Sequence, residues 1–585
     1  MLQELPTRNP GQNNFVSSPK AHATHHTKPS SLKTVHLLHV YSLRSLPPSI
    51  QKLAKPIRLT IGGCRSFQLP GGLSKLKRLK QLHLELFEEL LPLPEDFGNL
   101  RALECLFVRR VKGITELPET VGLLPQLQQL TIDSYSSSSW LPRSLPNVST
   151  LTELNFTQPG GVELPDGIGQ LSKLKSIKLA SFVTAVHHPR PSSLPRDFGQ
   201  LSALEILILS DLTQLSHLPD SFTMLSSLQK LEIRGCSRLT ALPEGTRDGL
   251  HHLRKLTLSH IAITHLPASF FHLSSLQAVD LCGLQCLRDC LLEGFSSFSH
   301  LRDLSLTLIP HLTSLPASLS PLALSLTSLT VQDCSELKSL PEEIGQLQML
   351  EKLELSKLDG LESIPRSLLK LPRLRELGVS HCKSLGGRRV DPLVGGRSNC
   401  SSSSSNNNLE CVEVEVLPSL QSLTINDVSS EILYSSLVCI SSLTKLRLEC
   451  MPALCALPAS ISRLSNLRSL FFSNATCLKA LPETVCRLSR LTYPCLHSLP
   501  NLLQLPEMIG RLKKLEWQRV AEDAGDNEEY DMRSDSMRGC NQHLPRLNHP
   551  QVNHCMRLPR VPLSFPRLDS LKCGYIPGTR EHAHR

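Results

Sequence analysis

One spacing of leucines constrains the fold of this chain more than any other feature. In residues 326–350 the apolar positions fall at offsets 0, 3, 5, 8, 11 and 14, namely Leu326, Leu329, Val331, Cys334, Leu337 and Leu340. Pro341 follows, and Leu350 starts the next copy 24 residues after the first. This spacing is neither helical nor strictly alternating, so it does not describe one long element. It predicts a short strand, a turn with inward apolar residues and a return segment that starts at a proline.

The same unit recurs from Leu32 to Leu571, with interruptions. Between Leu69 and Leu164 its Leu-Pro pair returns every 23 or 24 residues, and the next interval is 30 because of a loop expected at Val183–Ser193. The pattern predicts six segments: a disordered polar leader (1–31), a repeat array (32–385), a flexible Ser/Asn-rich insertion (386–416), a continued array (417–518), an acidic irregular segment (519–543) and terminal degenerate repeats with a tail (544–585).

The unit also predicts how the copies pack. Side chains alternate along a strand, so the residues at offsets 3 and 5 point into the core, and the polar residues at offsets 2, 4, 6 and 7 are left on the concave sheet face. One strand per unit, about 4.8 Å from the next, gives a parallel sheet. A proline suits the first position of a helical or 3-10 turn, and Pro118, Pro219, Pro341 and Pro482 are expected there. The return segment is wider than the strand, so the sheet is expected to be concave.

These residues carry a family resemblance. LQKLEIRGCSRLTALPEGTRDGL (Leu228–Leu250) resembles the leucine-rich repeats of plant nucleotide-binding disease-resistance proteins and of plant intracellular Ras-group repeat proteins. The resemblance implies an α/β leucine-rich-repeat solenoid with short helical or 3-10 return segments on the convex side. The chain has no GxxxxGK[ST] phosphate loop. The resemblance therefore implies a sensor or adaptor, with a scaffold for a Ras-like GTPase as the alternative.

Composition narrows the function further. The formal charge is 62 − 52 = +10 over 585 residues and is not clustered, so nucleic acid is not an expected partner. The N-terminus lacks the apolar run of a signal peptide, and no stretch reaches 18 uninterrupted apolar residues. We therefore expect a cytoplasmic protein with access to the nucleus and no membrane contact.

Cysteine and histidine clusters give the alternative of another class, a metal-binding or enzymatic protein. Their residue types suit zinc or, for three thiolates, an iron–sulfur cluster. The first cluster lacks an identified fourth ligand and would spread around one coil, and the spacing of the second matches no known motif. The clusters are Cys282, Cys286 and Cys290, and Cys540, His543, His549, His554 and Cys555; the pairs His187-His188 and His251-His252 have no nucleophile nearby in sequence. Cysteines at offset 8, such as Cys236, Cys334 and Cys382, are expected to pack in the core. We predict no catalytic residue, metal or cofactor.

The outward-facing strand positions give the preferred hypothesis, a protein-binding surface on the concave face. Its character is expected to change along the chain from apolar to basic to acidic. The predicted contact residues are Ile206, Ile208, Lys230, Glu232, Arg234, Lys255, Asp280 and Asp303. A smaller mixed patch is expected at Cys105, Phe107, Arg109 and Arg110. Exposed apolar groups beside charges are typical of protein-binding surfaces. The outward-facing residues therefore predict a non-enzymatic binding protein, and the family resemblance implies a setting in plant defence or intracellular signalling.

Overall fold

The computed structural model describes most of the repeat array. The described residues are 33–47, 50, 56–114, 116–135, 141–159, 163–182, 194–244, 249–287, 298–315, 319–385, 417–428, 440–451, 454–457, 459–497, 499–508 and 551–553. They divide into two compact units, Met1–Leu301 and Arg302–Arg585. The predicted leader (1–31) and insertion (386–416) lie outside the described residues, as do 519–543 and all of 544–585 except one strand.

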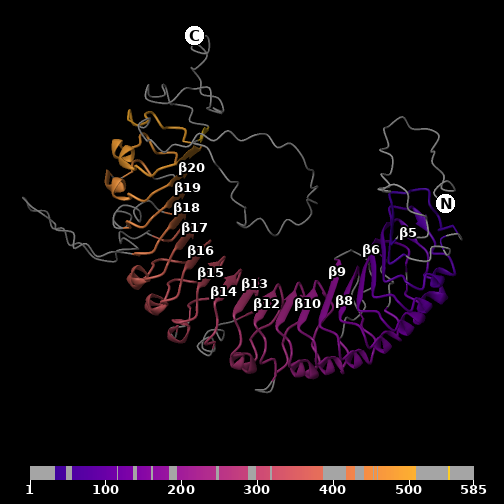
Figure 1. Cartoon of the computed structure of the whole chain (residues 1–585). Helices are drawn as coiled ribbons and strands as arrows, with labels where there is room; N and C mark the ends of the chain where they lie inside the picture. The colour runs from indigo at the N-terminus through magenta and orange to yellow at the C-terminus, as the bar shows by residue number, and fades with distance from the viewer. Residues whose placement is uncertain are drawn as a thin grey trace, which may run out of the picture. The chain divides into compact units, whose positions relative to one another are not determined.

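Each unit is built on a parallel sheet with one strand per repeat (Figure 1). The strands of the first unit are β1 (Thr34–Leu38), β2 (Arg58–Gly62), β4 (Gln81–Phe87), β6 (Cys105–Val111), β7 (Gln129–Ser134), β8 (Glu153–Pro159), β9 (Ser176–Phe182), β10 (Ile206–Ser210), β11 (Lys230–Arg234), β12 (Lys255–Ser259) and β13 (Ala278–Cys282). A separate parallel pair joins β3 (Ser66–Phe67) and β5 (Glu89–Leu90). The sheet strands of the second unit are β14 (Asp303–Thr307), β15 (Ser328–Gln332), β16 (Lys352–Ser356), β17 (Glu376–Ser380), β18 (Ser422–Asn426), β19 (Lys445–Glu449), β20 (Ser469–Ser473), β21 (Tyr493–His497) and β22 (Gln551–Asn553).

The strands pair without a register shift over the central repeats. Leu231 of β11 faces Leu207 of β10 and Leu256 of β12, and all three are buried. Because side chains alternate, this pairing stacks the offset-3 and offset-5 leucines into one continuous core. The predicted strand positions and the solenoid fold are confirmed.

The return segments are 3-10 turns in the part of the chain that the structure describes. In the first unit they are η4 (Leu73–Lys75), η5 (Glu95–Asn99), η6 (Glu119–Leu123), η7 (Leu145–Asn147), η8 (Ile168–Gln170), η9 (Phe198–Gln200), η10 (Asp220–Met224) and η11 (Ala268–His272). In the second unit they are η13 (Ser320–Leu322), η14 (Glu342–Gln346), η15 (Arg366–Lys370), η18 (Ala459–Arg463) and η19 (Glu483–Arg487). Within each unit they lie on the opposite side of the core from the sheet (Figure 1).

The position of the prolines corrects one expectation. Pro118, Pro219, Pro341 and Pro482 each lie one residue before the 3-10 segment, in extended conformation, and not at its first position. The carbonyl of Pro341 accepts a hydrogen bond from the Ile344 N–H at 3.1 Å. A residue just before a helical turn has this role, because its carbonyl already accepts the first bond of the turn.

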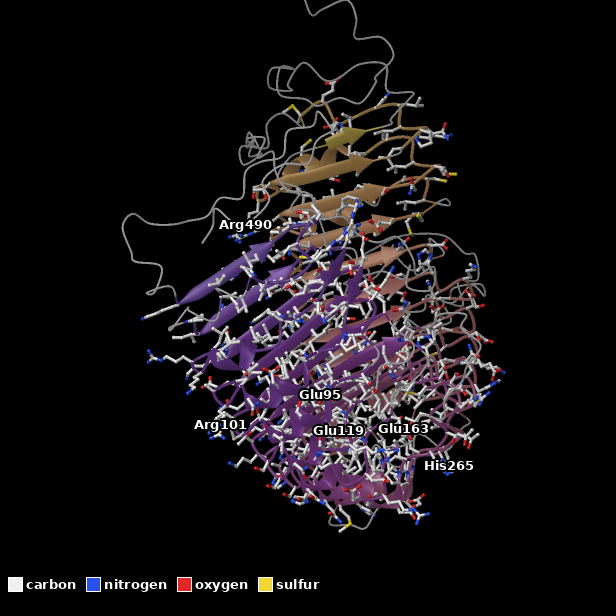
Figure 2. All side chains as sticks on the ribbon, turned by 90° about the vertical axis from the view of Figure 1, so that its right-hand side faces the viewer. Glu95, Arg101, Glu119, Glu163, His265 and Arg490 are labelled. Carbon is white, nitrogen blue, oxygen red and sulfur yellow. The ribbon has the colours of Figure 1, made fainter. Side chains whose placement is uncertain are left out.

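Polar contacts between neighbouring coils hold the return segments in place. Glu119, labelled in Figure 2, accepts hydrogen bonds from the backbone N–H groups of Arg143 at 3.0 Å and Ser144 at 2.8 Å. Partial desolvation raises the pKa of the Glu119 carboxyl, but these hydrogen bonds outweigh it and leave the pKa below its ordinary value. Close approach of the coils also requires glycine: a Cβ on Gly199 would lie 1.8 Å from the Ser221 carbonyl oxygen. Consecutive return segments are therefore fixed to one another.

Candidate protein-binding surfaces

The sheet of the first unit brings seven of the eight predicted contact residues together on the face opposite the core. Ile206, Lys230 and Lys255 form one row across β10–β12, and Ile208, Glu232 and Thr257 form the next. Asp280 of β13 continues the second row beside Thr257. We call the group Ile206, Ile208, Lys230, Glu232, Arg234, Lys255 and Asp280 the central surface. Asp303 starts β14 in the second unit, where it is exposed, and is not part of this group.

The sequence predicted that Glu232 projects freely from its strand, but in the structure its side chain is paired and largely buried. Its carboxylate lies 3.2 Å from Lys230 Nζ and 3.4 Å from Arg234 Nη2, and the residue is only 8% exposed. Lys230 and Arg234 flank Glu232 on the same face of β11, two residues to either side, so one carboxylate holds both cations. Two of the predicted basic contacts are therefore already paired within their own strand.

Lys255 of the central surface and Lys178 of β9 have no such partner among the described residues. Among the described residues, no carboxylate lies within 4.0 Å of the amino group of Lys255 or of Lys178, which faces Ile208 from β9. Lys255 also lies directly opposite Lys230, a like-charged neighbour. Beneath these groups Thr257 is 1% exposed, and its hydroxyl has no hydrogen-bond partner among the described residues. Lys255, which the sequence singled out, and Lys178, which it did not, therefore carry charge without a described carboxylate partner.

The predicted apolar pair lies beside these cations. Ile206 and Ile208 are both partly exposed, whereas Leu207 and Leu209 of the same strand are fully buried. Side chains of β-branched residues are stiff, so Ile206 and Ile208 lose little conformational entropy when a partner covers them. Apolar, then basic, then acidic residues follow one another from β10 to β13, which is the order predicted from the sequence.

A second group on the same sheet contains an aromatic residue. Phe107 of β6 lies with its ring centroid 4.5 Å from that of His83, and the Arg109 guanidinium is 5.0 Å from the Phe107 centroid. Burial, and next the charge of Arg58, lower the pKa of His83. Burial raises the pKa of the Asp133 carboxyl, although the charge of Arg110 opposes it. We call His83, Phe107, Arg109 and Asp133 the aromatic cluster.

The sequence predicted this cluster only in part. Phe107 and Arg109 share the sheet face as expected, but Cys105 is buried, because long polar side chains flank it in register. Its thiol donates a hydrogen bond to Gln129 Oε1 at 3.4 Å. Arg110 has a left-handed backbone (φ 52°) and lies at the irregularity of β6 between Arg109 and Val111, where the strand register shifts. His83 and Asp133 were missed, although both occupy outward-facing strand positions.

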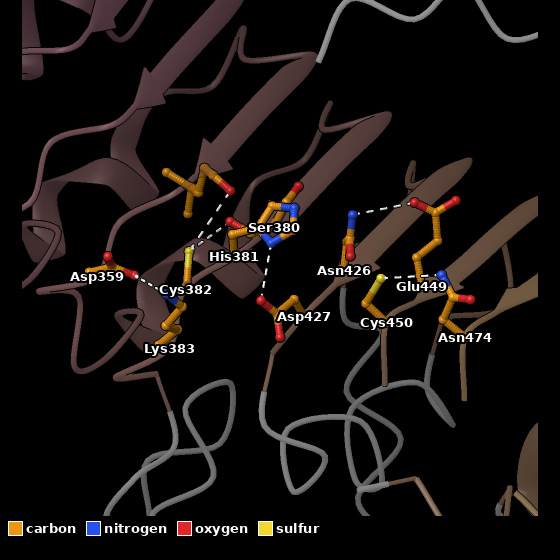
Figure 3. A network of polar contacts seen from close by, with 11 residues as sticks. Asp359, Ser380, His381, Cys382, Lys383, Asn426, Asp427, Glu449, Cys450 and Asn474 are labelled. Carbon is orange, nitrogen blue, oxygen red and sulfur yellow. Dashed lines mark hydrogen bonds and ion pairs between the residues drawn. The ribbon is translucent and has the colours of Figure 1, made fainter. Parts of the chain in front are cut away.

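In the second unit a row of polar contacts follows the ends of the strands (Figure 3). His381 Nδ1 lies 3.1 Å from Asp427 Oδ2, and Lys383 Nζ lies 4.0 Å from Asp359 Oδ1. His381 and Asp427 are 46 residues apart, yet β17 pairs directly with β18. The ladder of strands therefore continues across the predicted insertion, and this row links neighbouring coils.

Comparisons with known proteins agree with this architecture. Residues 235–283 match the leucine rich repeat family profile. The described strands and 3-10 return segments form a leucine-rich-repeat solenoid. It is 27% identical over 203 residues to Disease resistance-like protein DSC1 of Arabidopsis thaliana, which is 34% of this chain and 14% of that protein. It is 29% identical over 195 residues to TMV resistance protein N of Nicotiana glutinosa, covering 33% of this chain and 15% of that one.

The leucine-rich-repeat chain thus spans only about a seventh of the length of these two relatives. Among solved structures, the leucine-rich-repeat protein LIC12759 of Leptospira interrogans is 19% identical, with a TM-score of 0.43. That comparison covers 82% of this chain and 96% of the other.

The predicted cysteine and histidine clusters fall mostly outside the described residues. Cys282 is partly exposed and Cys286 exposed, while Cys290, the group Cys540–Cys555 and the pair His187-His188 are not described. The rings of His251 and His252 lie 4.1 Å apart, and His252 Nδ1 contacts the Ser226 carbonyl at 2.8 Å. Within the described ranges no three metal-ligating side chains come together, and no helix is long and apolar enough to cross a lipid bilayer.

Proposed function

We propose that this leucine-rich-repeat chain is a non-enzymatic sensor or adaptor that binds another protein through the concave sheet face of its first unit. The observation that carries the proposal is the central surface: partly exposed Ile206 and Ile208 of β10 lie between Lys178 of β9 and Lys255 of β12, which have no described carboxylate partner. Apolar groups bordered by uncompensated charge are typical of protein-binding sites, where apolar anchors contribute most of the affinity and charges select the partner.

The biological setting in this proposal is plant defence or intracellular signalling, in the cytoplasm with access to the nucleus. Its support is the similarity of about a third of the chain to two plant resistance proteins. Repeat arrays of this type expose a broad sheet surface whose outward residues can vary without disturbing the core. Such a surface suits selective recognition of protein partners.

Capture of partners from plant tissue tests this function. The full chain, immobilised, would be compared with Ile208→Asp on the sheet face and Met224→Asp on η10, where Met224 is 65% exposed. We expect a protein that the parent and Met224→Asp capture equally and that Ile208→Asp loses, because a charge would enter the apolar contact. Mass spectrometry would identify it, including any Ras-like GTPase. Equal capture by Ile208→Asp, with loss in Met224→Asp, would contradict the proposed face.

A further inference from the structure

Glu232 lies between two positively charged side chains of its own strand. Its carboxylate is held between Lys230 at 3.2 Å and Arg234 at 3.4 Å, and the Glu232 side chain is 10% exposed. The side chains of Lys230 and Arg234 remain 34% and 49% exposed. Both cations can therefore contact a ligand from solvent while Glu232 lies beneath them.

The surroundings of this group are basic. Lys255 lies opposite Lys230 on β12, and Lys178 lies across Ile208 on β9. Lys230, Arg234 and Lys255 thus border the Glu232 carboxylate, and a fourth cation, Lys178, lies two strands away beyond Ile208. Asp280 of β13, two strands away on the other side, marks the limit of the basic region. Like charges directly opposite one another on a sheet are unfavourable unless an anion lies between them.

We infer that the central surface binds an acidic, extended peptide segment of a protein partner, and that Glu232 occupies the position that a partner carboxylate takes. This inference rests on the proposed function, because it assigns the chemistry of a ligand to the same face. In the unbound protein Glu232 neutralises Lys230 and Arg234 and so competes with the partner for them. Glu232 is therefore a negative determinant of affinity within its own binding surface.

The spacing of the cations defines the ligand further. Measured across the sheet, Lys178 and Lys255 are three strand steps apart, about 14 Å at about 4.8 Å per strand, and they are offset by two residues along the strands. An extended peptide covers that distance in about four residues. A segment with carboxylates about four residues apart and an apolar residue between them would contact Lys178, Lys255 and the two isoleucines together. A nucleic acid offers the anionic charge but not the apolar side chain, so Ile206 and Ile208 favour a protein.

A synthetic peptide tests the inference directly. The probe is a fluorescein-labelled twelve-residue peptide with glutamate at every fourth position, leucine midway between glutamates and serine elsewhere. Binding to the full chain is measured by fluorescence anisotropy, with a matched peptide carrying lysine for glutamate. We expect Glu232→Gln to bind the acidic peptide about fivefold more tightly, because one ion pair is worth about 1 kcal/mol. We expect Lys255→Glu to bind it at least fivefold more weakly.

Control measurements separate the possible failures. Glu163→Gln changes the same residue type at an exposed position before η8, labelled in Figure 2, and should leave affinity unchanged. A melting temperature equal to that of the parent shows that each variant is folded. If Glu232→Gln does not fold, the Lys255→Glu variant still tests the inference. Unchanged or weaker binding by Glu232→Gln would refute the competing role of Glu232.

Two further outcomes distinguish this inference from the proposed function. In the first, the acidic peptide binds no better than its lysine counterpart while Ile208→Asp still fails to capture the partner. In that case the inference of an acidic ligand is refuted, and the proposed binding face is retained. If a single-stranded DNA oligonucleotide of equal charge binds more tightly than the peptide and loses affinity in Lys255→Glu, the partner is a nucleic acid and the inference is overturned.

Discussion

Replacing Leu231 by alanine is expected to lower the free energy of unfolding by about 2–5 kcal/mol. Leu231 is fully buried in β11, between Leu207 and Leu256 of the flanking strands. Removing its side chain loses apolar burial and leaves a cavity that neighbouring coils cannot fill without breaking the strand register. In a repeat array each coil is stabilised mainly by its neighbours, so the loss affects both adjoining interfaces.

Denaturation by urea measures this effect, and the chain offers a control with the same chemical change. Leu123 at the end of η6 is 66% exposed, so Leu123→Ala should change stability by no more than about 0.5 kcal/mol. Equal destabilisation by the two variants would show that Leu231 is not in a close-packed core and would contradict the register described here.

A second large effect is expected in the reactivity of the cysteines. Burial raises the pKa of the Cys236 thiol to about 12 and those of Cys334 and Cys382 to about 11. Since the thiolate is the reactive species, less of it is present at pH 8 than in a thiol of ordinary pKa: about a thousandfold less for Cys236 and about a hundredfold less for Cys334 and Cys382. Shielding by the core slows reaction further. We expect iodoacetamide to modify exposed Cys286, Cys455 and Cys477 long before the buried group.

Mass spectrometry of digested protein, with and without urea during labelling, provides the measurement. Cys236, Cys334 and Cys382 should become modified only when the chain unfolds. Modification of Cys236 in the folded protein at the rate of Cys286 would contradict its place in the core. The same comparison would give a direct view of which coils open first as urea is increased, because Cys236 and Cys382 lie in different units.

Much of the fold could be predicted because the place of each residue depends mainly on its position within its own repeat. A strand of five residues places Leu231 and Ile233 on one face and Lys230, Glu232 and Arg234 on the other, whatever surrounds it. The 24-residue period then puts equivalent residues side by side. For the same reason the offset-8 position of Cys236 could be assigned to the core from sequence alone.

The surface was harder to predict, because its details depend on side-chain torsions and on contacts between strands. Sequence placed Glu232 on the correct face but could not show that it lies between two cations. Cys105 is covered by its neighbours in register, which a single-repeat pattern does not contain. His83 joins Phe107 only because β4 pairs with β6 in this register. Assignment to a face was therefore reliable, whereas exposure was not.

Photo-crosslinking tests the central claim, that the sheet face of the first unit binds the partner, most directly. A benzophenone side chain would be placed in separate proteins at Ile208 on β10 and at Met224 on η10, which lie on opposite sides of the core. Each would be irradiated with the partner obtained in the capture experiment. We expect a covalent complex from position 208 and none from position 224; a complex formed only from position 224 would show that the partner binds the opposite side of the core.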